Sequence, residues 1–133
     1  MSFHSIALKG FERRSPLADE LRRSLADVAK VTDDAAQAEV VLEALTDTRE
    51  KSVVASTAAG QVRELQLRVR FRFRLTTPGG RELLPPDELV LSRDMSYNET
   101  NALAKEQEEN LLYRAMQSDI VNQVMRRVSA ARI

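Results

Sequence analysis

Cysteine and tryptophan are absent from this sequence of 133 residues, and histidine occurs once, at His4. The absence of cysteine excludes disulfides, thiol catalysis and cysteine metal sites. One histidine leaves little material for a histidine metal cluster or a Ser-His-Asp triad, so we interpret His4 as structural or solvated. Aromatic residues make up 5% of the chain, which argues against a base-stacking platform for nucleic acid. The residues give no positive indication of an enzyme or of a cofactor.

Long apolar runs and an excess of charge of one sign are also missing. No run approaches the roughly 20 apolar residues of a membrane-spanning helix. Twenty basic and twenty acidic residues cancel, so no overall field draws the protein to nucleic acid or to a membrane. The first residues do not have the pattern of a signal peptide. Two interpretations stay open: a cytosolic protein, or the mature domain of an exported one.

The apolar periodicity predicts the element order β-α-β-β-β-α. We expect strands over 3–8, 39–56, 61–77 and 81–97, a first helix beginning at Ser15-Pro16 and fading near 31–34, and a long helix over about 100–130. Serine suits the N-cap of the first helix and proline its first turn. Pro85-Pro86 in the last strand favours a sheet edge or a break. The second and third strands are long enough for their hairpin to project beyond the sheet.

These elements predict one α+β domain over residues 1–133. The fold expected is a two-layer sandwich with both helices on one face of a four-stranded mixed sheet. The expected shared core consists of Leu21, Leu25, Leu67, Val69, Phe71, Phe73, Ile120 and Val124. The apolar stripes expected on the two helices are Leu17, Leu21, Leu25 and Val28, and Leu103, Leu112, Met116, Ile120, Val124 and Val128.

Residues 64–75, ELQLRVRFRFRL, alternate strictly between apolar and polar side chains. This two-residue period indicates a strand with one buried face, whose other face carries Arg68, Arg70, Arg72 and Arg74 in a column about 6.6 Å apart. Two interpretations of this column stay open. Either acids on neighbouring strands pair with it, or the column is an intermolecular surface. The candidate acids are Glu39, Glu43, Asp47, Asp87 and Asp94.

Two further groups of residues receive a structural interpretation. Gly79-Gly80 lacks the spacing of a phosphate-cradling glycine motif and is interpreted as a turn. Glu106, Glu108 and Glu109 lie on a highly charged helix and are interpreted as a solvated face.

Three segments carry a resemblance to a known family. They are GQVRELQLRVRFRF, PGGRELLPP and LSRDMSYNETNALAKEQEENLLYRAMQSDIVNQVMRRV. Arg93, the step Ala102-Leu103-Ala104-Lys105, Glu108 and the pair Arg126-Arg127 are its most specific residues. In these segments and in its element order, the chain resembles the LptE family of lipopolysaccharide-assembly lipoproteins of Gram-negative bacteria.

The resemblance implies a protein without a catalytic site, cofactor or metal. Its partner would be LptD, the outer-membrane β-barrel, in whose lumen LptE proteins form a plug, and together they deliver lipopolysaccharide to the outer leaflet. The location implied is the periplasmic side of the outer membrane, with an N-terminal lipidated cysteine as anchor. Because this sequence has no cysteine, we expect it to be the mature part without the signal peptide and anchor. No nucleic acid partner is expected.

The resemblance also implies residues that bind lipopolysaccharide. Lys105 occupies the family's basic position after Ala-Leu-Ala, whereas the family's other basic position, in the turn between the second and third strands, is Ala58 here. We therefore expect Lys51 or Arg63, on the flanking strands, to replace it. The partner interface expected with the barrel is Arg68, Arg70, Arg72 and Arg74, since an outer-membrane barrel has a polar lumen. The alternative function is a cytosolic protein-binding adaptor with a basic sheet face.

Overall fold

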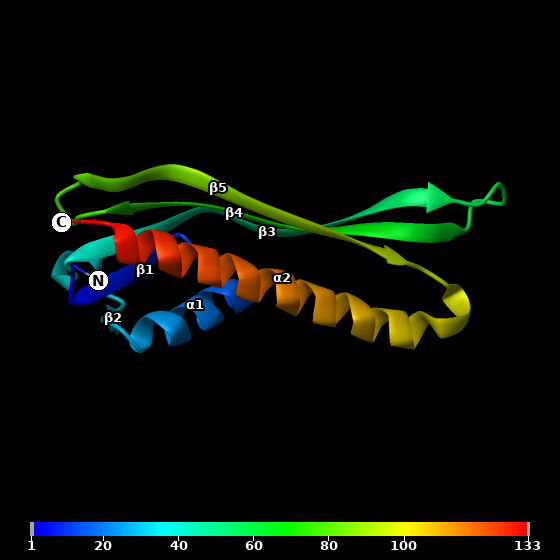
Figure 1. Ribbon diagram of the computed structural model, residues 1–133, viewed down its shortest axis with the longest axis horizontal. Coiled ribbons are helices and arrows are strands. Elements are labelled where there is room, and N and C mark those ends of the chain that lie inside the picture. Colours follow the sequence, from blue (N-terminus) through cyan, green and yellow to red (C-terminus); the bar gives the residue numbers. More distant parts are fainter. Residues whose placement is uncertain (1, 133) are drawn as a thin grey trace.

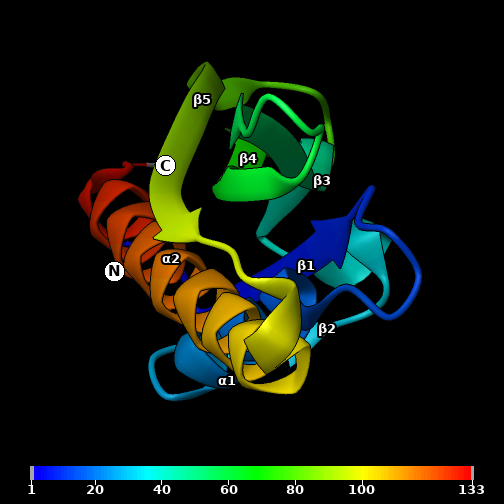
Figure 2. The same ribbon diagram turned by 90° about the vertical axis from the view of Figure 1, so that its right-hand side faces the viewer.

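The computed structural model describes residues 2–132 and has two layers, a twisted sheet and two helices that cover one of its faces (Figures 1 and 2). In chain order the elements are β1 (Ser5–Lys9), α1 (Pro16–Ala26), β2 (Lys30–Thr32), the 3-10 turn η1 (Ala35–Gln37), β3 (Val40–Ser56), β4 (Val62–Thr76), β5 (Glu82–Ser96), the 3-10 turn η2 (Glu99–Asn101) and α2 (Ala102–Ala130). The predicted α+β class and the helices on one face are confirmed.

The sheet has five strands in the order β2-β1-β3-β4-β5, so the prediction of four strands is wrong. β1 runs parallel to β2 and β3, and the β3–β4 and β4–β5 pairs are antiparallel, so the sheet is mixed as predicted. The missed strand, β2, has only three residues, too few for an alternating pattern to stand out. It completes a β1–α1–β2 crossover beside β1.

The first helix begins as predicted but ends earlier. Ser15 is its N-cap, with the Ser15 hydroxyl accepting from the backbone N–H of Ala18 at 3.1 Å, and Pro16 is its first residue. The helix ends at Ala26, because the chain must turn to place Lys30 beside β1, where its N–H donates to the carbonyl of His4. Val28 therefore lies outside the helix and is exposed, contrary to the predicted stripe.

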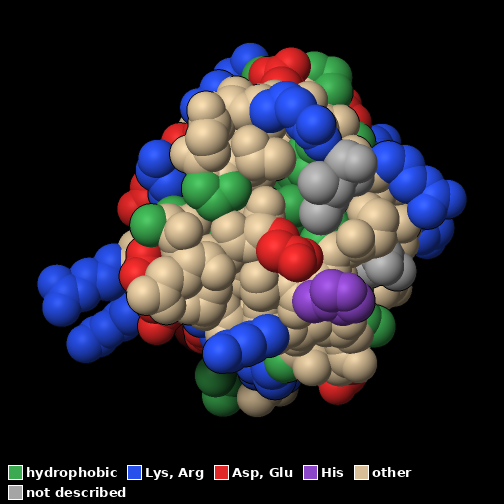
Figure 3. Space-filling view, turned by 90° about the vertical axis from the view of Figure 1, so that its left-hand side faces the viewer, with side chains coloured by type: hydrophobic (Ala, Val, Ile, Leu, Met, Phe, Trp, Pro, Cys, Tyr) green, Lys and Arg blue, Asp and Glu red, His purple; other side chains and the backbone are tan. Residues whose placement is uncertain are grey.

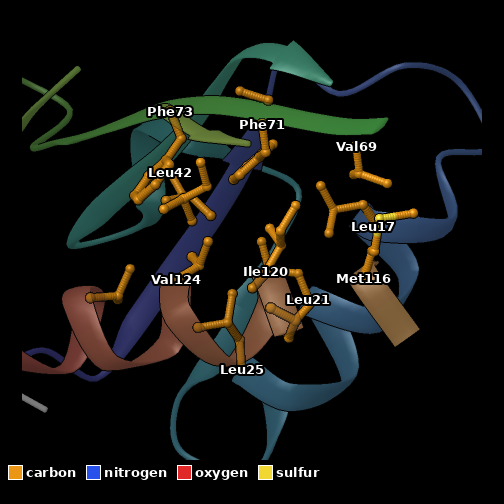
Figure 4. Packing of buried hydrophobic residues seen from close by; sticks show 14 of the residues in the cluster. Leu17, Leu21, Leu25, Leu42, Val69, Phe71, Phe73, Met116, Ile120 and Val124 are labelled. Carbon is orange, nitrogen blue, oxygen red and sulfur yellow. The ribbon is translucent and has the colours of Figure 1, made fainter. Parts of the chain in front are cut away.

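Strand β4 has the predicted two-sided character. Every apolar residue from Leu65 to Leu75 is buried, and all eight residues of the predicted core are buried with them. Figure 4 shows Val69, Phe71 and Phe73 directed from β4 toward Met116, Ile120 and Val124 of α2 and the leucines of α1. The Phe71 and Phe73 rings stack with their centroids 5.3 Å apart. The hydrophobic core thus lies between the sheet and the helices.

The hairpin of β3 and β4 projects, as predicted, and its tip forms one far end of the molecule (Figure 1). Beyond Ala44, no residue of β3 is buried. The register of β3 against β4 shifts at Ala44/Thr46 and again at Val53/Ala55, which displaces the exposed residues Leu45 and Val54. Strand β5 is an edge strand, and its pairing with β4 is irregular opposite Pro85-Pro86, as the prolines predicted.

Helix α2 runs beneath most of the length of the sheet (Figure 1). Its buried residues begin only at Tyr113, and Leu103, placed in the buried stripe from the sequence, is 72% exposed. The physical reason is that α1 and the short strands β1 and β2 lie at the other end (Figure 1). The first eleven residues of α2 therefore face the projecting hairpin on one side and solvent on the others.

Candidate functional site

The arginine column lies on the sheet face opposite the helices, and acids on both neighbouring strands neutralise much of it. Arg74 pairs with Glu43 at 2.6 Å. Arg70 pairs with Glu88 at 2.9 Å and with Glu50 at 3.5 Å, and Glu50 also lies 3.7 Å from Arg68. The interpretation of internal pairing is therefore confirmed for these three arginines.

The sequence identified only one of the acids that pair with the column. Glu43 does so, whereas Glu39, Asp47, Asp87 and Asp94 have no ion pair with it among residues 2–132. The sequence missed Glu50 and Glu88. These two acids lie near the arginines because bulges in β3 and β5 shift the register of the strands.

Arg72 differs from the other three arginines. It is exposed, and among residues 2–132 no carboxylate lies within 4.0 Å of it. It stands between Arg70 and Arg74 on the same strand face, opposite Thr46 of β3 and Glu88 of β5. Glu88 binds Arg70 instead, so the exposed guanidinium of Arg72 has no protein hydrogen-bond partner between residues 2 and 132.

Two of the three predicted lipopolysaccharide-binding residues meet at one hollow. Lys51 of β3 and Lys105 of α2 both line a space of about 300 Å³ below the projecting hairpin. Leu65, Met95, Tyr97 and Ala102 give it apolar walls, and Glu106 and Glu109 add two carboxylates. The hairpin and the start of the final helix thus bring together two lysines that are 54 positions apart in the sequence.

Both lysines are held in place by carboxylates of α2. Lys51 Nζ donates to Glu109 at 3.0 Å, and this hydrogen bond raises the pKa of Lys51 above its ordinary value. Lys105 Nζ donates to Glu108 at 3.0 Å and to the hydroxyl of Ser96 at 2.8 Å. Glu108 and Glu109 therefore bind lysines and are half-buried, whereas the sequence predicted a solvated face. Glu106 is exposed, as predicted.

Arg63 and Ala58 lie outside this hollow. Arg63 lines a separate space of about 150 Å³ with Asn98 and Thr100, although Tyr97 borders both spaces. Ala58 is exposed in the turn at the tip of the hairpin, which the N–H of Gly60 closes by donating to the carbonyl of Thr57. The structure therefore groups Lys51 with Lys105 and leaves Arg63 beside them.

A polar network between the helices was not identified from the sequence. Arg49 Nη2 donates to Gln117 Oε1 at 2.8 Å, and its guanidinium lies 5.0 Å from the centre of the Tyr113 ring. Gln117 is buried and in turn donates to Glu20 at 2.8 Å. Burial raises the pKa of Tyr113, whose hydroxyl donates to the carbonyl of Glu50. No signal could have revealed this network, because its members come from three distant elements.

Other kinds of site find no support in the part of the chain that the structure describes. Between residues 2 and 132, no group of three or more histidines, aspartates or glutamates is placed to hold a metal ion. None of the described helices is long and apolar enough to cross a membrane. His4 is exposed, as predicted, and Figure 3 shows it (purple) on the surface at the end of the molecule opposite the hairpin tip.

Known proteins resemble this chain in sequence and in fold. The family described as LptE, lipopolysaccharide-assembly, matches residues 3–128. No curated protein matches the chain. Among solved structures, a lipoprotein B of uncharacterised role from Nitrosomonas europaea is 30% identical, with a TM-score of 0.82 over 96% of this chain and 83% of that one.

Two further solved structures share the fold at lower identity. The rare lipoprotein B of Shewanella oneidensis is 24% identical, with a TM-score of 0.76 over 96% of this chain and 95% of that one. A minor lipoprotein of Acinetobacter baumannii is 22% identical, with a TM-score of 0.77 over 98% and 95% of the two chains. The family match favours a lipoprotein of lipopolysaccharide assembly over a cytosolic adaptor, and it is a match to non-enzymatic proteins. The chain belongs to the LptE family of lipopolysaccharide-assembly proteins.

Proposed function

We propose that this protein plugs and supports assembly of the LptD β-barrel and binds lipopolysaccharide during its delivery to the outer leaflet. Membership of the LptE family supports the general role in lipopolysaccharide assembly. The observation that carries the binding role is the hollow shared by Lys51 and Lys105. It combines two ammonium groups with an apolar wall. A phosphorylated lipid presents the matching groups, an anionic phosphate and an apolar chain.

The lysines of the hollow are suited to exchange one anion for another. Lys105 sits one turn into α2, where a cation is unfavourable for the helix dipole, so its position does little to stabilise the helix. Glu108 and Glu109 hold both ammonium groups in place in the absence of ligand. A lipid phosphate would compete with these carboxylates, and each charge-assisted contact contributes about 1.5–3 kcal/mol.

The open face of the sheet is suited to the polar lumen of a barrel. Three of the four arginines in the column are already fixed by acids, so this face is rigid and polar without a large net charge. Arg72 adds an unused guanidinium in the middle of it. A surface of this kind can make hydrogen bonds to a polar wall while its own ion pairs keep their geometry. We therefore propose Arg68, Arg70, Arg72 and Arg74 as part of the LptD interface.

The proposed location is the periplasmic side of the outer membrane. The family is one of lipoproteins, which supports an outer-membrane address. We further propose that residues 1–133 are the mature domain and that a lipidated cysteine preceding them anchors it. Expression of the natural gene and mass spectrometry of the membrane-extracted protein would test this. A mature protein without a lipid would contradict the proposed anchor.

The ligand role can be tested by measuring how tightly the purified protein binds lipopolysaccharide. Microscale thermophoresis with a fluorescent label suits a protein without tryptophan. We expect Lys105→Asp to weaken binding about tenfold or more, since it removes a contact worth about 1.5–3 kcal/mol and adds repulsion. Lys51→Asp should weaken it less, because Lys51 is the more exposed of the two, and Arg63→Asp least. Added salt should weaken binding of the wild type.

The acids of the hollow provide the opposite test. Glu109→Gln removes the negative charge beside Lys51 and keeps the size of the side chain, and Glu108→Gln does the same beside Lys105, so both should strengthen lipopolysaccharide binding. Lys30→Asp, an equal charge change on β2 at the other end of the molecule, is the matched control. If Lys105→Asp binds as the wild type does, or if Lys30→Asp loses as much, the ligand site is misassigned. Co-purification with LptD tests the plug role separately.

A further inference from the structure

A third basic surface lies between the two helices, away from both the arginine column and the hollow of Lys51 and Lys105. Pro16, Asp19 and Arg23 form one face of α1, and Asn110, Arg114 and Gln117 form one face of α2, each set with helical spacing. Arg49 of β3 closes the space between them. The result is a hollow of about 410 Å³, which we name the interhelical groove.

The charges of the interhelical groove are not balanced. Three guanidinium groups, from Arg23, Arg49 and Arg114, line it with one carboxylate, Asp19, which leaves two positive charges in excess. Among residues 2–132, none of the three arginines has a carboxylate within 4.0 Å. This differs from the sheet column, where acids on the same sheet pair with three of four arginines. Three cations that line one space with a single carboxylate repel one another unless a further anion binds between them.

One of these arginines is held by a buried network. Arg49 is fixed by the side-chain oxygen of Gln117 at 2.8 Å and by the Tyr113 ring. Gln117 is only 7% exposed, and its own amide is oriented by Glu20 at 2.8 Å. The same oxygen of Glu20 also accepts from the hydroxyl of Ser118 at 3.2 Å, so two donors hold this carboxylate in place. A buried polar chain that fixes an exposed guanidinium is the arrangement of a preorganised binding group.

The groove continues into a smaller hollow of about 160 Å³ that shares Arg49 and Gln117. Arg13 and Arg14 line this extension, together with Glu12 and Asp47. These two arginines and two carboxylates balance, and Asp47 also accepts a hydrogen bond from Ser15. The excess of positive charge is therefore confined to the groove itself.

From these observations we infer that the interhelical groove binds a phosphate group, with Arg49, Arg114 and Arg23 as its donors. The three arginines line the space from three different elements, α1, β3 and α2. A tetrahedral phosphate accepts hydrogen bonds in several directions, whereas a planar carboxylate accepts one fork in its own plane. Asp19 and Asn110 line the same space and can bind hydroxyl groups next to the phosphate. The ligand is thus either free phosphate or a phosphorylated saccharide.

Nuclear magnetic resonance titration of the folded protein tests this inference without lipopolysaccharide or LptD. The probes are inorganic phosphate and glucosamine 1-phosphate, and sodium chloride at matched ionic strength is the control. We expect saturable shifts at the Nε–H groups of Arg49 and Arg114 with the phosphate probes alone. Tighter binding of glucosamine 1-phosphate would support a saccharide ligand, and equal binding of both probes would support free phosphate.

Variants locate the site. Arg49→Gln and Arg114→Gln should each weaken phosphate binding about tenfold, or about 1.4 kcal/mol. Arg126→Gln, which removes an exposed arginine from the same helix outside the groove, should leave binding unchanged. Arg49→Lys keeps the charge and loses the fork, so its affinity should fall between those of Arg49→Gln and the wild type. Equal responses to chloride and phosphate, or an equal loss in Arg126→Gln, would overturn the inference, as would shifts confined to Lys51 and Lys105.

Discussion

The two ends of the molecule are built differently. At the end that holds both termini, α1, β1, β2 and the last turns of α2 surround a core in which Ile6, Leu21 and Val128 are fully buried. At the hairpin end, β3 beyond Ala44 and α2 before Tyr113 bury none of their residues. Among the described residues, the apolar face of β4 continues the core into that end, together with Met95 of β5.

This difference indicates that one end of the molecule provides most of the stability and that the hairpin end provides surface for recognition. Among the described residues, five of the seven large apolar side chains that are exposed lie at the hairpin end, namely Leu45, Val53, Val54, Leu103 and Leu111. The hollow of Lys51 and Lys105 lies there as well. A region with few buried contacts adds little to the free energy of unfolding and is free to carry surface for ligands and partners. We therefore expect substitutions at the two ends to affect different measurements.

The largest expected effect belongs to the core. Phe71 is fully buried and stacks on Phe11 and Phe73, so Phe71→Ala should lower the free energy of unfolding by about 3–5 kcal/mol. Leu103→Ala, at the hairpin end, removes an exposed leucine and should change it by less than about 0.5 kcal/mol. Urea titration of both variants measures the difference. A loss below about 1 kcal/mol for Phe71→Ala would mean that the core does not close around β4.

Two glycines allow the same comparison for the backbone. Gly10 has a φ of +84°, and a Cβ there would lie 2.4 Å from the carbonyl oxygen of Ala44, so Gly10→Ala should cost about 2–4 kcal/mol. Gly60, in the hairpin turn, has a nearly equal φ of +83° and open space around it. Gly60→Ala should therefore cost only the conformational strain, about 1–2 kcal/mol. Equal losses in thermal unfolding would show that Ala44 can move away.

The sequence predicted parts of both ends of the molecule and missed parts of both. Ser15-Pro16 and the alternation of β4 depend on local chemistry, so the start of α1 and both faces of β4 could be predicted. The three-residue strand β2 has too little pattern to be recognised, and it exists because the chain returns beside β1. Leu103 has the helical spacing of a buried residue, but it is exposed because the core does not extend to the start of α2.

For the candidate site, the sequence could predict residue types but not partners. Lys51 and Lys105 were predicted separately, and their meeting at one hollow depends on how far α2 extends under the hairpin. Glu50 and Glu88 became the partners of the arginine column through bulges at Leu45 and near Pro85-Pro86, which no local pattern specifies. The interhelical groove depends on three elements that contact one another only in the fold.

Alkaline pH provides a smaller test, because the pKa values of two groups near the boundary between the ends are raised. Burial raises the pKa of Tyr113, and the hydrogen bond to Glu109 raises that of Lys51. A raised pKa gives stability that is complete below the unfolded value, about 10 for tyrosine and 10.4 for lysine, and is lost as the pH rises through the folded value. The free energy of unfolding should therefore fall above about pH 10, by at most about 1.4 kcal/mol per pH unit for each group.

Two variants show how much each end of the molecule contributes to this decline in the free energy of unfolding. Tyr113→Phe removes the buried phenol and should flatten the decline, at the expense of the hydrogen bond to Glu50 at neutral pH. Lys51→Met, at the half-exposed ion pair of the hairpin end, should flatten it less, since water screens that pair. Urea titrations at several pH values measure both slopes. A larger effect from Lys51→Met would place more of the stability at the hairpin end than its burial indicates.

The smallest expected effects lie within the arginine column, where Arg70 and Arg72 are neighbours on the same face of β4 but only Arg70 has acids. Arg70→Ser leaves Glu50 and Glu88 without that partner and should cost up to about 1 kcal/mol, the upper value for exposed pairs. Arg72→Ser removes a cation that repels its neighbours and should be neutral or slightly stabilising.

Salt and partner binding separate the two roles of the column. Because ions screen exposed pairs, the difference in thermal midpoint between Arg70→Ser and Arg72→Ser should shrink as salt is added. Co-purification with LptD should follow the opposite order, since the guanidinium of Arg72 is available to a partner and that of Arg70 is already bound to two acids. If Arg72→Ser lowers the midpoint as much as Arg70→Ser and leaves LptD co-purification intact, Arg72 has a structural partner in solution. The arginine column would then stabilise the sheet and would not form the proposed interface.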